Sequence, residues 1–213
     1  MGLRHCIDVS AADWIANSRV PWAQLVEFGP AGFPAYARLR FIPDPVREGQ
    51  DEADVDVGPD WPSERELLGE ALQVLRQHTG TADECYFCVW DGWGAEWITD
   101  VAALGQPPPG VQLPMVDIGF DDPPRSKSPD RSYFLLRGGV SDFLDPDGAW
   151  AEIPEPVEPA FVWPADHAWC VAFDVDPHHA GIGASTAAID ELMRHPGLDV
   201  VRAIPDAHQP HYN

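Results

Sequence analysis

The chain has 213 residues, of which 35 are acidic and 13 are basic, so its formal net charge is −22. Nucleic-acid backbones and anionic membrane surfaces are bound mainly through lysine and arginine, and this charge makes both unsuitable as partners. The same charge attracts cationic partners. Only one of the basic residues is a lysine, Lys127.

The negative charge is concentrated in two parts of the chain. Residues 44–66, the first acidic segment, contain nine acidic residues and two arginines, and residues 142–166, the second acidic segment, contain seven acidic residues and no basic one. Proline-rich loops are expected over 43–62 and 145–166, which largely coincide with these two segments. The pattern is compatible with a solvated surface, a face for a basic protein, a divalent-cation site or mimicry of nucleic acid.

The composition is that of a folded globular chain, and the elements predicted below indicate an α+β fold. Hydrophobic residues make up 45% of the chain and include nine tryptophans, which is enough for a substantial core. Since 23 residues are prolines, regular elements should be short. We expect one domain over residues 1–213, with a mostly antiparallel or mixed sheet, two main helices and long proline-rich loops.

The N-terminal residues lack the apolar core of a secretory signal, and no apolar run reaches the length of about 18 residues typical of a membrane span. Four cysteines in a chain of this size do not form a disulfide framework. These features predict a cytoplasmic protein with reduced thiols.

The predicted elements follow from local periodicity and from capping and turn residues. The clearest is a helix over 64–78, because Ser63 and Glu66 form a capping box and leucines recur at helical spacing. In chain order, the sequence predicts a helix over 10–17 capped by Ser10, strands over 22–28 and 33–42, the helix 64–78, strands over 85–91 and 115–120, a strand pair over 133–136 and 140–144, a strand over 169–175, a helix from Ser185 to about 195 and a strand over 198–203.

Two short motifs have alternative interpretations. Cys85 and Cys88 form a C-x-x-C, but in a strand their side chains point to opposite faces, which favours structural cysteines over a redox or zinc pair. The segment 181–185 (GIGAS) either cradles an anion or forms an ordinary helix entry with Ser185 as the cap.

An aromatic cluster follows the predicted strand 85–91. Trp90, Asp91 and Trp93 could form a platform on which a sugar or a base stacks, with Asp91 accepting a hydrogen bond from a hydroxyl group. The alternative is a strand that ends in a tight turn and contributes its tryptophans to the core.

The strongest metal-like pattern is Asp174, Asp176 and His178. Two carboxylates and a histidine within five residues could hold a divalent ion, although further ligands are needed. The alternative is a pair of solvated acidic residues at the end of a strand.

Residues 85–94 (CYFCVWDGWG) and 163–185 (WPADHAWCVAFDVDPHHAGIGAS) resemble a group of uncharacterised proteins of actinomycete-type bacteria. This resemblance implies no activity. We therefore expect non-enzymatic binding or regulation of a basic protein, as immunity-type proteins do, with no cofactor. The alternatives are a small metal-dependent hydrolase that uses Asp174, Asp176 and His178, and a small-molecule or glycan binder that uses Trp90, Asp91 and Trp93.

Overall fold

The computed structural model describes residues 2–93, 114–118, 131–153, 157–174 and 178–213. Within them the fold is α+β, with one nine-stranded sheet in which every strand pair is antiparallel. The strand order is β1-β5-β3-β6-β7-β8-β2-β9, and β4 pairs with β5. The strands are β1 (Arg4–His5), β2 (Ala35–Arg40), β3 (Cys85–Trp90), β4 (Met115–Ile118), β5 (Arg131–Gly138), β6 (Phe161–Pro164), β7 (Cys170–Ala172), β8 (His179–Ala184) and β9 (Val200–Ala203).

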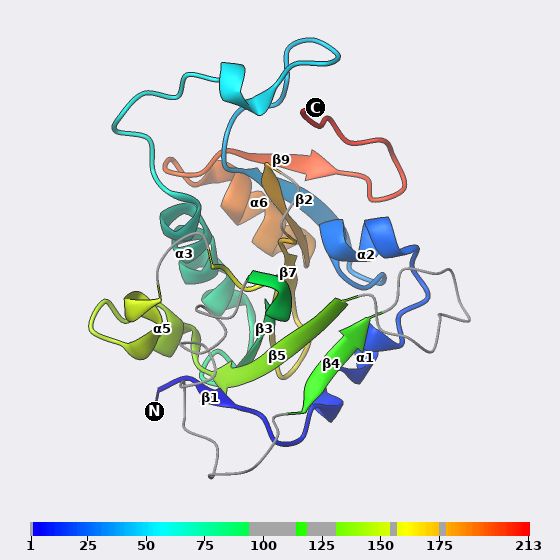
Figure 1. The fold of residues 1–213 in the computed structure, drawn as a ribbon, viewed down its shortest axis with the longest axis vertical. Helices are drawn as coiled ribbons and strands as arrows, with labels where there is room; N and C mark the ends of the chain where they lie inside the picture. Colours follow the sequence, from blue (N-terminus) through cyan, green and yellow to red (C-terminus); the bar gives the residue numbers. More distant parts are fainter. Residues whose placement is uncertain (1, 94–113, 119–130, 154–156, 175–177) are drawn as a thin grey trace.

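Helices cover both faces of the sheet (Figure 1). One face packs against α3 (Glu64–Leu75), α5 (Val140–Phe143) and α6 (Thr186–Arg194). The other face packs against α1 (Asp13–Ala16) and α2 (Trp22–Phe28), and α2 lies on β7 and β8. Because side chains alternate along a strand, each central strand contributes to both cores. Short 3₁₀ helices complete the described elements: η1 (Ser10–Ala12), η2 (Glu52–Asp54), η3 (Arg76–His78), η4 (Asp91–Trp93) and η5 (Ala149–Glu152).

The local capping signals that the sequence shows at two helices are confirmed. The Ser63 hydroxyl accepts the Glu66 N–H, and the Glu66 carboxylate accepts the Ser63 N–H at 2.8 Å, so that α3 begins with a complete capping box. Ser185 caps α6 by accepting the Ala188 N–H at 3.2 Å. Such bonds join residues three apart in sequence and therefore depend little on the rest of the fold.

Two predicted strands are wrong, because both segments form helices. The segment 22–28 is α2, which follows Pro21 and buries Leu25, Val26 and Phe28. Its apolar residues, which Gln24 and Glu27 interrupt, fit a short strand as well as a short helix. The segment 140–144 is α5, whose first turn is fixed by the Asp142 carboxylate accepting the Gly139 N–H at 2.9 Å.

Other predicted boundaries need correction. Ser10 does not cap a helix with its side chain; its N–H instead donates to the Asp8 carboxylate, and the segment 10–17 is η1 followed by α1. The predicted strand 169–175 is shorter, since β7 ends at Ala172. The predicted loop 145–166 contains the buried strand β6. The described part of the predicted strand 115–120 is β4, and residues 119–120 lie outside the described residues.

The glycines of the segment 181–185 lie inside β8 rather than in an anion cradle, and the alternative prediction of a helix entry capped by Ser185 is confirmed. A Cβ at Gly181 would overlap the backbone carbonyl of Glu27 in α2, and a Cβ at Gly183 would overlap the ring of Phe33. The two glycines therefore let α2 and the turn after it lie directly on the strand. This close approach determines where the side chain of Glu27 lies.

We predict that Gly181→Ala lowers the free energy of unfolding by about 3 kcal/mol, because the added methyl group meets backbone rather than a movable side chain. Gly197→Ala is the matched control, since a Cβ there approaches only the His195 ring at an ordinary 3.5 Å. Urea unfolding of both variants measures the difference. Equal stability of the two variants would contradict the close packing of α2 on β8.

Candidate functional site

The two described residues of the predicted metal site, Asp174 and His178, have different partners. Asp174 is buried and forms an ion pair with Arg131, whose guanidinium lies 4.7 Å from the ring centroid of Trp90 and 5.4 Å from that of Trp22. His178 instead contacts Asp44. Asp176 lies outside the described residues, so the triad itself stays a prediction. Among the described residues, no group of three His, Cys, Asp or Glu side chains is arranged to hold a metal ion.

The aromatic cluster is packed rather than open. Trp90 and Trp93 are both partly buried and meet edge to face, with ring centroids 6.1 Å apart. Burial raises the pKa of the neighbouring Asp91. Stacking of a sugar or a base on Trp90 and Trp93 is not tested by these contacts and stays a prediction.

The C-x-x-C cysteines lie on opposite faces of β3, as the strand period predicts. Burial raises the pKa of Cys85 to about 12 and the pKa of Cys88 well above its usual value. Thiols in such surroundings are poor nucleophiles and poor metal ligands.

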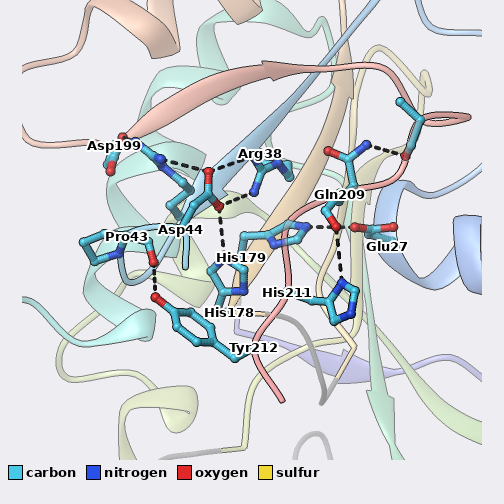
Figure 2. Close-up of polar contacts among 12 residues, drawn as sticks. Glu27, Arg38, Pro43, Asp44, His178, His179, Asp199, Gln209, His211 and Tyr212 are labelled. Atoms are coloured by element: carbon cyan, nitrogen blue, oxygen red, sulfur yellow. Dashed lines mark hydrogen bonds and ion pairs between the residues drawn. The ribbon is translucent and has the colours of Figure 1, made fainter. Parts of the chain in front are cut away.

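A cleft rich in histidine lies where β8 begins, and Figure 2 shows the polar contacts around it. Its volume is about 640 Å³. We call it the histidine cleft; it is lined by Glu27, Glu52, His178, His179 and residues 207–213. Its walls therefore come from α2, the first acidic segment, the start of β8 and the C-terminal segment, which are far apart in the sequence.

Asp44 is the central carboxylate beside this cleft. It accepts two hydrogen bonds from Arg38 (2.6 and 3.0 Å), one from Arg40 (2.9 Å) and one from His178 Nε2 (3.1 Å). Arg40 also donates to Asp199 at 2.6 Å, which connects β2 to the residue before β9. Burial opposes ionisation of Asp44, but the hydrogen bonds from Arg38 and His178 and the charge of Arg38 outweigh it and hold its pKa well below the usual value. Asp44 is thus a permanently charged acceptor that anchors the start of the first acidic segment.

His178 lies behind this carboxylate and contacts the C-terminal segment through the ring of Tyr212, edge to face at 4.8 Å. Burial lowers its pKa, and the hydrogen bond to Asp44 offsets this only in part. The ring is therefore neutral near pH 7 and donates from Nε2, since the carboxylate can only accept.

A second histidine–carboxylate pair lies next to the first. His179 Nε2 is 3.1 Å from Glu27 Oε1, and the rings of His178 and His179 meet edge to face at 5.0 Å. The His179 side chain is 2% exposed and that of Glu27 is 25% exposed, so the carboxylate faces the cleft and the imidazole lies behind it. His179 Nδ1 is buried and has no hydrogen-bond partner among the described residues.

The C-terminal segment closes one wall of the cleft. The Tyr212 hydroxyl donates to the Pro43 carbonyl at 2.5 Å, and the Asn213 N–H donates to the Gln50 carbonyl at 3.1 Å. These bonds fasten the segment to residues at and near the start of the first acidic segment. Figure 1 shows both at the same end of the molecule.

Sequence reasoning selected His178 but missed Glu27, Asp44 and His179 as its neighbours. The histidine pair was a visible signal, but the carboxylates lie more than one hundred residues away in sequence. The one local hint was Gly181, a glycine two residues after His179 that requires another backbone close by.

Comparison with protein-family models, with curated proteins and with solved structures finds no match for this chain. Among the described residues, no helix has both the length and the apolar character needed to cross a membrane.

Asp44→Ala should lower the free energy of unfolding by about 3 kcal/mol, because it leaves the buried Arg38 guanidinium without its charge partner. Asp54→Ala is the matched control from the same acidic segment. Its pair with Arg47 is solvent-exposed, with side chains 55% and 63% exposed, and should contribute less than about 1 kcal/mol. Chemical denaturation compares them, and similar losses for both would contradict the central role of Asp44.

Acidification should destabilise the protein partly through His178. Its folded pKa lies below its ordinary value of 6.5, so below about pH 6.5 the unfolded chain binds more protons and stability falls as the pH falls. The variant His178→Asn has no titratable ring at this position. It keeps the groups that face His178, which are Asp44, His179, Arg38 and Tyr212. Urea unfolding at about pH 7.5 and about pH 5.5 should show a smaller loss for this variant than for the wild type.

The exposed His208 supplies the control for this measurement. His208→Asn should keep the full pH-dependent loss, because the ring is solvated at the rim of the cleft. An unchanged loss in His178→Asn would show that other groups cause the acid sensitivity.

Proposed function

We propose that the protein is a non-enzymatic binding or regulatory protein whose first acidic segment receives a basic protein partner. The observation that carries this proposal is a set of exposed carboxylates that form no ion pair within the described residues: Glu48, Asp51, Glu52, Asp56 and Asp60. Because no basic side chain among the described residues pairs with these carboxylates, their electrostatic field extends into the solvent. There it accelerates and orients the approach of a basic surface.

The segment that carries these charges is attached at several points. Asp44 fixes its start, and the Trp61 indole N–H near its end donates to the Phe41 carbonyl at 2.6 Å. Between them, the Gln50 side chain accepts the Val46 N–H at 2.9 Å, and the Gln50 carbonyl accepts from Asn213. A loop that is already ordered loses less conformational entropy on binding, which favours a defined binding face over a diffuse charged tail.

The two acidic segments meet at the N-terminus of α3. Arg65 donates to Glu158 at 2.5 Å and to the carbonyls of Ile153 and Val157 at 2.6 and 3.0 Å. This contact joins the end of the first acidic segment to the second, which also carries exposed carboxylates such as Asp147 and Glu152. A partner that reaches both segments would be a protein rather than a small cation.

Our proposal places the protein in the cytoplasm. All four cysteines are free thiols and three of them are buried, which supports a reducing compartment.

A defined oligoarginine peptide tests the proposed function. We expect it to bind the wild-type protein with an affinity that falls steeply as salt is added, because the contacts are exposed charge pairs. The triple variant Glu48→Gln, Asp51→Asn and Asp60→Asn should bind about tenfold more weakly, which corresponds to about 1.4 kcal/mol. Fluorescence anisotropy of a labelled peptide measures both effects.

A charge-matched control distinguishes this face from net charge. The variant Asp13→Asn, Glu70→Gln and Asp83→Asn removes the same number of exposed charges outside both acidic segments. It should bind almost as well as the wild type. Equal weakening by the two triple variants would show that net charge alone attracts the peptide, and the proposed function would then be wrong.

A further inference from the structure

We propose that Glu27 and His179 form a subsite in the histidine cleft for a single N–H-donating organic cation, a guanidinium or ammonium group. The subsite rests on the proposed function in that this group would be an arginine or lysine side chain of the basic partner. The Glu27 carboxylate would bind the charged end of that side chain, with the His179 ring directly behind it, beside the first acidic segment.

The first argument is the unused capacity of Glu27. The nearby Asp44 already accepts four hydrogen bonds and faces two arginines. Glu27 has no arginine or lysine partner among the described residues, and its one ion-pair contact is to His179. A carboxylate can accept about four hydrogen bonds, so Glu27 retains both charge and acceptor positions on the wall of the cleft.

The second argument is the orphaned nitrogen of His179. Because a carboxylate can only accept, Nε2 carries the hydrogen of the His179–Glu27 bond, and Nδ1 makes no hydrogen bond among the described residues. It is buried without a partner, and a buried polar atom in this state is costly unless a donor reaches it. The Glu27 carboxylate and the His179 ring behind it line the same cleft, so a positive ligand that carries more than one N–H and binds Glu27 also lies beside a ring whose second nitrogen lacks a donor.

The third argument is the surroundings of the pair. The cleft volume of about 640 Å³ lies within the range of roughly 300–1,000 Å³ typical of ligand sites. Tyr212 supplies an aromatic ring on its wall, and cations bind favourably over such a ring. Glu52 belongs to both the cleft and the first acidic segment, so a chain lying on that segment can direct one side chain into the cleft.

The arrangement disfavours an anionic ligand. Arg38 and Arg40, which bind the carboxylate beside the cleft, direct their terminal nitrogens at Asp44 and Asp199. Arg47, which lies against the same C-terminal segment, pairs with Asp54. An anion would therefore meet Glu27 and Glu52 without a free guanidinium to offset them.

The experiment uses the full chain with ¹⁵N-labelled histidine and three small probes: N-acetyl-arginine amide, N-acetyl-lysine amide and N-acetyl-citrulline amide. Citrulline has the shape of arginine without its charge. The arginine probe should shift the side-chain ¹⁵N resonances of His179, assigned with His179→Gln, whereas the citrulline probe should not. A shift with the lysine probe as well supports a site that recognises charge and N–H donation, and its absence supports a guanidinium site.

Two variants test the role of Glu27. Glu27→Gln keeps the size of the side chain and should weaken the arginine probe by at least about tenfold. Asp60→Asn removes one charge from the first acidic segment outside the cleft and should change affinity by less than about twofold. Glu27→Asp retains the charge and should bind better than Glu27→Gln, which separates a lost charge from a disturbed fold.

The inference is overturned if the arginine probe leaves His179 unaffected, or if citrulline and arginine shift it equally. That failure is distinct from failure of the proposed function. If oligoarginine binding still depends on Glu48, Asp51 and Asp60, the acidic face stands without the subsite. If oligoarginine binding does not change when those residues are substituted, while the arginine probe shifts the ¹⁵N resonances of His179, the subsite stands without the acidic face.

Discussion

The interaction on which this end of the molecule depends is the contact of Asp44 with Arg38, Arg40 and His178. An arginine side chain as buried as Arg38 is tolerated only with a charged and well-aligned partner. Asp44 supplies that partner from the chain that leaves β2, and Arg40 extends the contact to Asp199 before β9. The same carboxylate thus stabilises three adjoining strands, β8, β2 and β9, and fixes where the first acidic segment begins.

A second constraint is steric and works through β8. Because Gly181 has no side chain, the backbone of Glu27 can lie against the strand, and its carboxylate then reaches His179 two residues earlier. Charge and packing therefore converge on the same two histidines: Asp44 binds one and Glu27 binds the other. The histidine cleft results from these two long-range contacts together with the C-terminal segment that Pro43 and Gln50 fasten in place.

The sequence predicted what short-range chemistry decides. Ser63 and Ser185 cap their helices through neighbours three residues away, and β3 keeps a strand period that separates Cys85 from Cys88. Where tertiary contacts decide, prediction failed. In the sequence, the glycines of β8 resemble an anion cradle or a helix entry, because their role depends on α2 and Phe33 packing against them. The apolar residues of 22–28 fit a strand and a helix equally well. His178 was recognisable, but Asp44 is 134 residues away and no local pattern joins them.

The arrangement of ion pairs explains why the charge of −22 acts outward. Arg38 and Arg40 face Asp44 and Asp199, Arg65 faces Glu158, and Arg131 faces Asp174. Each of these pairings matches arginines with an equal number of carboxylates, so the buried and half-buried pairs leave the net charge unchanged. The excess must therefore lie on other residues, including the exposed carboxylates between 48 and 60. Glu27 is the exception, because it is three-quarters buried and faces a histidine instead of an arginine. It brings the negative charge of the surface into the cleft, where a cation from outside is the group that can balance it.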